Sequence, residues 1–221
     1  MKNKLGTVFM IFGALLVAAA AVLLIYNHKE DKDAGAAAEN TLPQVVDVIK
    51  ENIEEQNQQN GQQGSTAKPV ITPKPHANSF NEQEVQLSYE MKTVEIDGHE
   101  YIGYISIPSI EIELPVMSAW SYPNLKKSPC RQFGTIMGKD LVIVGHNYAR
   151  HFGNIYRLKP DDVLKFTDMD GNVTLYSVLG VEQLGATDVE QMKAGAWDLT
   201  LYTCTYGGRN RIVVRFRMIN S

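Results

Sequence analysis

Residues 198–218 have the sequence DLTLYTCTYGGRNRIVVRFRM. The first part has the two-residue period of a β-strand and ends at Cys204. The residues on the face of Cys204 are Thr200 and Tyr202, and those on the opposite face are Leu199, Leu201 and Thr203. A Gly-Gly turn then leads to a second strand that begins at Arg211. The two strands therefore form a hairpin that brings Arg211 back toward Cys204.

The second strand of this hairpin has one apolar face and one face that carries arginines. The apolar face is formed by Ile212, Val214, Phe216 and Met218, and the other by Arg211, Val213, Arg215 and Arg217. We expect Arg215 and Arg217 to lie on the solvated exterior of the sheet. Arg211 differs from them because it follows the turn directly.

Short strand patterns also precede the hairpin, with turn sequences such as IDGH and DMDG between them. Strands are predicted at residues 101–107, 112–117, 141–145, 163–166, 173–181, 199–203 and 212–218. Helical patterns are short and lie at residues 152–158 and 188–193. Many strands without long intervening helices indicate a mainly β domain, either a closed barrel or a sandwich, over residues 85–221.

The sequence VIVGHNY places a histidine at the end of an apolar strand, directly after Gly145. The other four histidines are explained as surface or packing residues, and they are His28, His76, His99 and His151. His146 can exchange protons near neutral pH, Cys204 can provide a thiolate, and Arg211 can provide charged donors for an oxyanion. A cysteine acyl-transfer enzyme requires these three functions.

The N-terminal segment, residues 1–26, is interpreted as a membrane anchor. Residues 8–26, VFMIFGALLVAAAAVLLIY, carry no charge and are just long enough to cross a bilayer as a helix. Lys2 and Lys4 precede them, which predicts a cytoplasmic N-terminus and an extracytoplasmic remainder. The alternative is a cleaved signal peptide, with the alanines at 36–38 as the cleavage site, and it exports the same remainder.

Residues 27–84 are predicted to form a polar extracytoplasmic tether. Their composition is rich in Gln, Asn, Glu, Lys, Ala and Pro, and such a chain buries too little apolar surface to offset its ordering entropy. Within it, residues 42–55 place apolar side chains at helical spacing, which favours one short amphipathic helix. The tether would hold the domain at 85–221 away from the membrane.

The composition excludes several classes of function. The 21 basic and 25 acidic side chains give a net charge of −4, so a nucleic acid is not an expected partner. Two cysteines are too few for a disulfide scaffold. Cys130 either pairs with Cys204 or is a lone thiol, and the lone thiol is favoured. No cofactor or metal is predicted. Turn and surface roles are favoured over calcium binding for four acidic residues, Glu111, Glu113, Asp168 and Asp170.

The order His146, Cys204, Arg211, with TLYTC before a strand led by arginine, resembles the sortases, the cysteine transpeptidases of Gram-positive cell surfaces. GHN and WDLTL resemble the motifs of class B sortases. The short connection GATDVEQMKAGA, at residues 185–196, instead resembles class A or D. The class therefore stays open, and with it the sorting motif and the amine acceptor.

The resemblance implies an eight-stranded barrel in which Cys204 attacks a threonine carbonyl in the sorting motif of a secreted protein. A thioester forms, and an amine of a peptidoglycan precursor or a pilin resolves it. His146 would be the general acid and base, and Arg211 the oxyanion donor. Substrate contacts are expected from Thr203, Asn147 and Tyr206, although strand parity turns Thr203 away from Cys204.

Two other functions remain open at this stage. One is a catalytically silent sortase-fold module that binds peptides or assembly partners. The other is a papain-like cell-wall hydrolase, which is disfavoured because those enzymes place cysteine before histidine in the chain, whereas His146 precedes Cys204 here.

Overall fold

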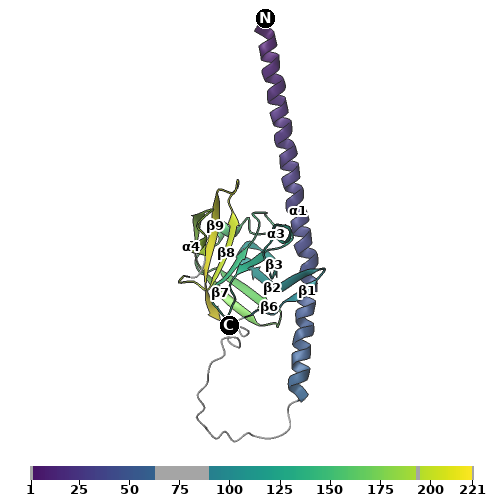
Figure 1. Ribbon diagram of the computed structural model, residues 1–221, viewed down its shortest axis with the longest axis vertical. Coiled ribbons are helices and arrows are strands. Elements are labelled where there is room, and N and C mark those ends of the chain that lie inside the picture. The colour runs from purple at the N-terminus through teal and green to yellow at the C-terminus, as the bar shows by residue number, and fades with distance from the viewer. Residues whose placement is uncertain (1, 63–89, 193–194, 221) are drawn as a thin grey trace.

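The computed structural model describes residues 2–62, 90–192 and 195–220. One long helix, α1 (Lys2–Gln62), lies along a β-barrel and extends beyond it at its N-terminal end (Figure 1). The short helices within these residues are, in chain order, η1 (Pro108–Ile110), α3 (Tyr122–Leu125), η2 (Ile155–Arg157) and α4 (Val189–Met192). The part of the expected tether at 63–84 lies outside the described residues.

Within the described residues, nine strands form one sheet. They are β1 (Val94–Ile96), β2 (His99–Ile107), β3 (Ile112–Met117), β4 (Cys130–Phe133), β5 (Leu141–Val144), β6 (Val163–Asp168), β7 (Val173–Gly185), β8 (Leu199–Cys204) and β9 (Asn210–Asn220). Their order is β1-β2-β3-β4-β5-β8-β9-β7-β6, and β2 also pairs with β6. That pairing closes the strands from β2 to β9 into the predicted eight-stranded barrel, and β1 extends β2 as a hairpin.

All seven predicted strands are confirmed, and β1 and β4 were missed. β1 has three residues, and β4 pairs with β3 at one position and carries a register shift against β5, so neither shows a regular alternation. The helix predicted at 152–158 is only the single turn η2. The one predicted at 188–193 is α4.

The apolar faces of the hairpin strands fill the barrel, as the alternation predicts. Leu199 and Leu201 of β8 pack with Val214 and Phe216 of β9, and all four side chains are fully buried. Burying a side chain of this size stabilises the fold by roughly 1.5–3 kcal/mol. The outward face of the same strands is also covered, since Tyr202 and Val213 pack in a second cluster with Cys130 and Met192.

Arg215 is buried, contrary to the expectation that it is solvated, and only 6% of its surface is exposed. Its Nε donates to Glu182 Oε1 at 2.6 Å, its Nη1 donates to Thr200 Oγ1 at 2.9 Å, and its guanidinium stacks on the Trp197 ring at 4.0 Å. It also donates to the carbonyls of Gln191 and Met192. The arginine therefore binds the β7–β8 connection to the outside of the barrel. Arg217 is exposed, as expected.

The expected flexible tether is wrong for residues 27–62, which continue α1 without a break. Ala34, Ala38, Val45 and Ile49 lie on one face of the helix and are buried against the barrel. Alanine, glutamate, lysine and glutamine are good helix formers, so the polar composition is compatible with helix once this face is covered. A helix was expected only at 42–55 because Ala34 and Ala38 are too small to give an apolar pattern.

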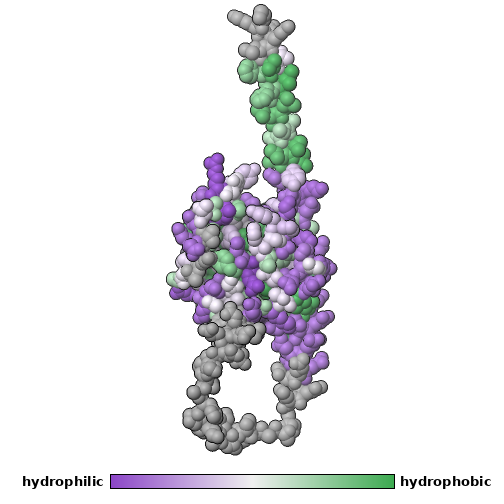
Figure 2. Space-filling model, in the orientation of Figure 1, coloured by the Kyte–Doolittle hydropathy of each residue, from purple (hydrophilic) through white to green (hydrophobic). Residues whose placement is uncertain are grey.

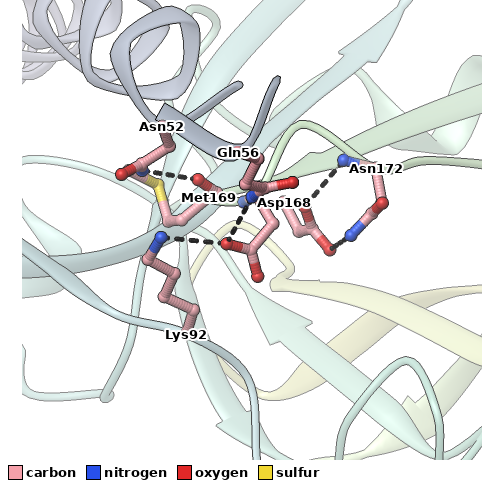
Figure 3. Close-up of polar contacts among 7 residues, drawn as sticks. Asn52, Gln56, Lys92, Asp168, Met169 and Asn172 are labelled. Atoms are coloured by element: carbon pink, nitrogen blue, oxygen red, sulfur yellow. Dashed lines mark hydrogen bonds and ion pairs between the residues drawn. The ribbon is translucent and has the colours of Figure 1, made fainter. Parts of the chain in front are cut away.

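Polar contacts attach the C-terminal part of α1 to the turn between β6 and β7 (Figure 3). Asn52 donates to the Met169 carbonyl at 2.7 Å, and both Gln56 and Lys92 donate to Asp170. Asp168 accepts hydrogen bonds from the backbone of its own turn, at Asp170 and Asn172. Asp168 therefore holds this turn, and Asp170 joins it to α1 and to Lys92.

We predict that Arg215→Ala destabilises the protein by about 2–3 kcal/mol. This is less than the cost of breaking a fully buried ion pair, because Glu182 remains half exposed. Urea unfolding of the full chain in detergent measures it. Arg217→Ala is the matched control, and it should change stability by no more than about 0.5 kcal/mol. Equal losses in the two variants would contradict the prediction.

Candidate functional site

The β8–β9 hairpin brings Cys204 and Arg211 together as cross-strand partners. Gly207 and Gly208 have φ angles of +83° and +72°, which glycine adopts without strain, and the Thr205 amide donates to the Asn210 carbonyl at 2.9 Å. Cys204 is partly buried at the end of its strand. Nη1 of Arg211 donates to the carbonyls of Gly208 and Asn210, at 2.9 and 3.1 Å, which holds the guanidinium against the hairpin.

The strand that leads to His146 lies on the other side of β8. Strand β5 runs parallel to β8 with Val144 beside Tyr202, and the Gly145 amide donates to the Tyr202 carbonyl at 3.1 Å. Continuing this register by two residues beyond the end of β5 predicts that His146 lies opposite Cys204. A Cβ at position 145 would lie 2.5 Å from the ring of Phe152, so glycine is required for this ring to pack under the strand end.

A cavity of about 410 Å³ opens at the end of β8. Its lining includes Cys204 and all three predicted substrate-contact residues, Thr203, Asn147 and Tyr206. Thr203 lines it despite its strand parity because the cavity lies across the end of the strand and not along one face. The Thr203 hydroxyl is buried, and it has no hydrogen-bond partner among the described residues.

Other lining residues were not found from the sequence, namely Phe152, Gly153, Tyr156, Thr205 and Ile212. Phe152 and Tyr156 lie in the predicted helical segment, and Ile212 belongs to the apolar face of its strand, so each has a packing role that explains it. His146 and Arg211 lie beside the cavity through their strand neighbours and do not line it. The structure thus gathers four of the six predicted site residues around one cavity.

A helix residue far away in the sequence contacts the histidine loop. Glu30 of α1 accepts hydrogen bonds from Tyr148 Oη at 3.0 Å and from Lys126 Nζ at 3.1 Å. The Tyr148 ring stacks against His146 with centroids 4.6 Å apart. Burial lowers the pKa of His146, and the negative charge of Glu30 opposes this effect. Nothing in the local sequence identifies Glu30, because its partners are near it only after α1 has packed on the barrel.

The family model for the sortase domain matches residues 105–219. The chain belongs to the sortase family. It is 31% identical over 121 residues to sortase A of Bacillus anthracis, an alignment that covers 52% of this chain and 57% of that protein. The chain therefore spans less than two thirds of the length of this relative.

Solved sortase structures have the same barrel. Sortase C1 of Streptococcus suis is 28% identical, with a TM-score of 0.50 over 56% of this chain and 75% of that one. A sortase C of Streptococcus pneumoniae, at 23% identity, has a TM-score of 0.55 over 82% of this chain and 97% of that one. The second likeness concerns the fold alone, and it extends over more of this chain than the first.

Two other residues of this sortase with reactive side chains, His151 and Cys130, are buried and have structural roles. His151 is fully buried, and its Nε2 lies 3.3 Å from the Ala34 carbonyl of α1. Burial lowers the pKa of His151 to about 4. Cys130 is also fully buried and is not bonded to Cys204, and burial raises the pKa of its thiol to about 12. The lone-thiol interpretation of Cys130 is confirmed.

We predict that Glu30→Gln lowers the pKa of His146. The substitution removes the negative charge that favours the imidazolium ion and leaves the opposing burial in place. The ring-proton chemical shifts of His146, followed against pH by NMR on the full chain in detergent, measure this pKa. Glu39→Gln is the control, since it removes a charge from the same helix that pairs with Arg150. An unchanged or raised pKa in Glu30→Gln would contradict the prediction.

Proposed function

We propose that this sortase is a membrane-anchored cysteine transpeptidase that joins secreted proteins to an amine. The observation that carries the proposal is the position of Cys204, which lines the cavity and pairs with Arg211 of β9, while the end of β5 that leads to His146 lies on the other side of β8. Three chain segments converge there. A packing role for Cys204 alone would not require this convergence.

In the first half-reaction the Cys204 thiolate attacks the threonine carbonyl of a sorting motif near the C-terminus of the substrate. The tetrahedral oxyanion that forms is stabilised by the Arg211 guanidinium, which keeps its charge at all relevant pH values. His146 then donates a proton to the leaving amine as the peptide C–N bond breaks. The product is a thioester on Cys204, and the downstream peptide is released.

In the second half-reaction an amine attacks the thioester carbonyl. His146, now neutral, accepts the proton of the incoming amine, and the C–S bond breaks to restore the thiolate. The acceptor is an amine of a peptidoglycan precursor or a lysine of a pilin. The cavity provides a Thr203 hydroxyl that has no partner within the described part of the chain and is available to the bound peptide, with Asn147 and Tyr206 at the exposed margin.

The location of the enzyme follows from α1. The N-terminal part of this helix is long and apolar enough to cross a membrane, and none of this apolar segment is buried against the domain. Lys2 and Lys4 precede this segment, and by the positive-inside rule they support a cytoplasmic N-terminus and an extracytoplasmic catalytic domain. The enzyme therefore meets its substrates after export.

We predict that Cys204→Ala forms no acyl-enzyme and leaves the fold intact. His146→Ala should lower kcat/KM by about 10²–10⁴-fold and Arg211→Ala by about 10²–10³-fold, because each removes a transition-state function. The measurements are mass spectrometry of the acyl-enzyme and amine transfer with a library of sorting-motif peptides. Arg209→Ala is the matched control and should retain activity. If the wild-type chain forms no thioester with any peptide, the catalytically silent module becomes the better description.

We predict that Thr203→Val lowers kcat/KM by about 5- to 10-fold, the effect of removing one hydrogen bond to the substrate. Valine has nearly the shape of threonine, so the cavity keeps its form. Thr203→Ser retains the hydroxyl and should recover most of the activity. If Thr203→Ser is as slow as Thr203→Val, the lost methyl packing and not the hydroxyl is responsible.

A further inference from the structure

Helix α1 fixes the distance between the membrane segment and the barrel. The apolar segment ends at Tyr26, and Glu30 follows one turn later, which corresponds to about 6 Å along the axis. Glu30 already contacts Lys126 and Tyr148 of the domain. No hinge separates the two because α1 is a continuous helix through this region. A membrane that holds the apolar segment therefore lies close to the end of the barrel at which His146 is found.

The two ends of the barrel contact α1 at widely separated positions. Glu30 lies beside the histidine loop, whereas Asn52 and Gln56 bind the turn between β6 and β7. Glu30 and Asn52 are about 33 Å apart along the helix. The β8–β9 loop rises at the end from which the N-terminal part of α1 extends, and the turn between β6 and β7 lies toward the other end (Figure 1). One end of the barrel thus faces the membrane.

The residues at the membrane-facing end have the composition of a lipid interface. Tyr206, at the tip of the β8–β9 loop, is 87% exposed, and Tyr156 at the same cavity is 60% exposed. Arg209 is exposed in the loop, and residues 205–210 contain no acidic side chain. In Figure 2 the apolar part of α1 ends level with the top of the barrel. Tyrosine and arginine are typical of the headgroup region, where a ring enters the interface and a guanidinium meets lipid phosphates.

We propose that the catalytic end of the barrel rests on the outer lipid surface, with Tyr206 in the interface and Arg209 on anionic lipid phosphates. This proposal rests on the membrane anchor of the proposed function. Cys204 lies directly before the loop, so the cavity opens beside the headgroups. The β8–β9 loop then has two roles, one as a wall of the cavity and one as a membrane contact.

The test uses the full chain reconstituted in vesicles of phosphatidylglycerol and phosphatidylcholine. Tyr206→Trp places a fluorophore at the loop tip, and Val173→Trp is the control, at a position that is 41% exposed and begins β7 next to the distal turn. Lipids brominated near the headgroup quench a nearby indole. The signal of the unsubstituted protein, which contains Trp120 and Trp197, is subtracted. We expect quenching of the added tryptophan at 206 and none at 173.

Two results would overturn the proposal: no quenching at 206, which leaves the loop in water, or equal quenching at 206 and 173, which lays the barrel on its side. Adding Arg209→Glu to Tyr206→Trp should reduce the quenching, and unchanged quenching would overturn the assignment of Arg209 to lipid phosphates. The measurement needs no catalysis and can be repeated in Cys204→Ala. Its failure is therefore distinguishable from failure of the transpeptidase reaction, which is assayed in detergent.

Discussion

Strand β8 is hydrogen-bonded on both sides, in parallel to β5 and antiparallel to β9, and the site depends on this double pairing. The register is set by burial, because Leu199 and Leu201 must face the barrel interior. A slip of one residue would turn these side chains to the other face and expose the apolar set. The same register puts Cys204 beside Arg211, and it puts Val144, two residues before His146, beside Tyr202. Packing inside the barrel thus determines the geometry at its rim.

Side chains on the outside of the barrel also pack against other parts of the chain. Arg215 binds the β7–β8 connection through Glu182, Thr200 and the Trp197 ring. A buried guanidinium loses its hydration, and this cost is offset by hydrogen bonds to a carboxylate and to backbone carbonyls. On another side α1 covers the barrel with small residues, at Ala34 and Ala38, which allow close approach. A helix that begins as an apolar segment is therefore an integral part of the domain.

The alternation of apolar side chains was sufficient to predict most strands, and the resemblance of the residues around Cys204 and His146 predicted the family. The burial of Arg215 was not predictable from the sequence. An arginine on the outward face of a strand is expected to lie in solvent, and only the fold brings its partners Glu182 and Trp197 to it. Helix α1 beyond residue 26 was missed because its buried face contains alanines among polar residues. The role of Glu30 depends on this packing and has no local signal.

The parallel pairing of β5 with β8 also determines when the site can form. The two strands are separated in the chain by β6, β7 and their connections, so loop closure makes their pairing a late and slow event. A chain synthesised from its N-terminus has His146 in place long before Cys204 and Arg211 follow. Until β8 and β9 enter the sheet, Cys204 does not lie beside Arg211. The cavity lined by Thr203, Cys204 and Tyr206 therefore forms only with the last two strands of the sheet.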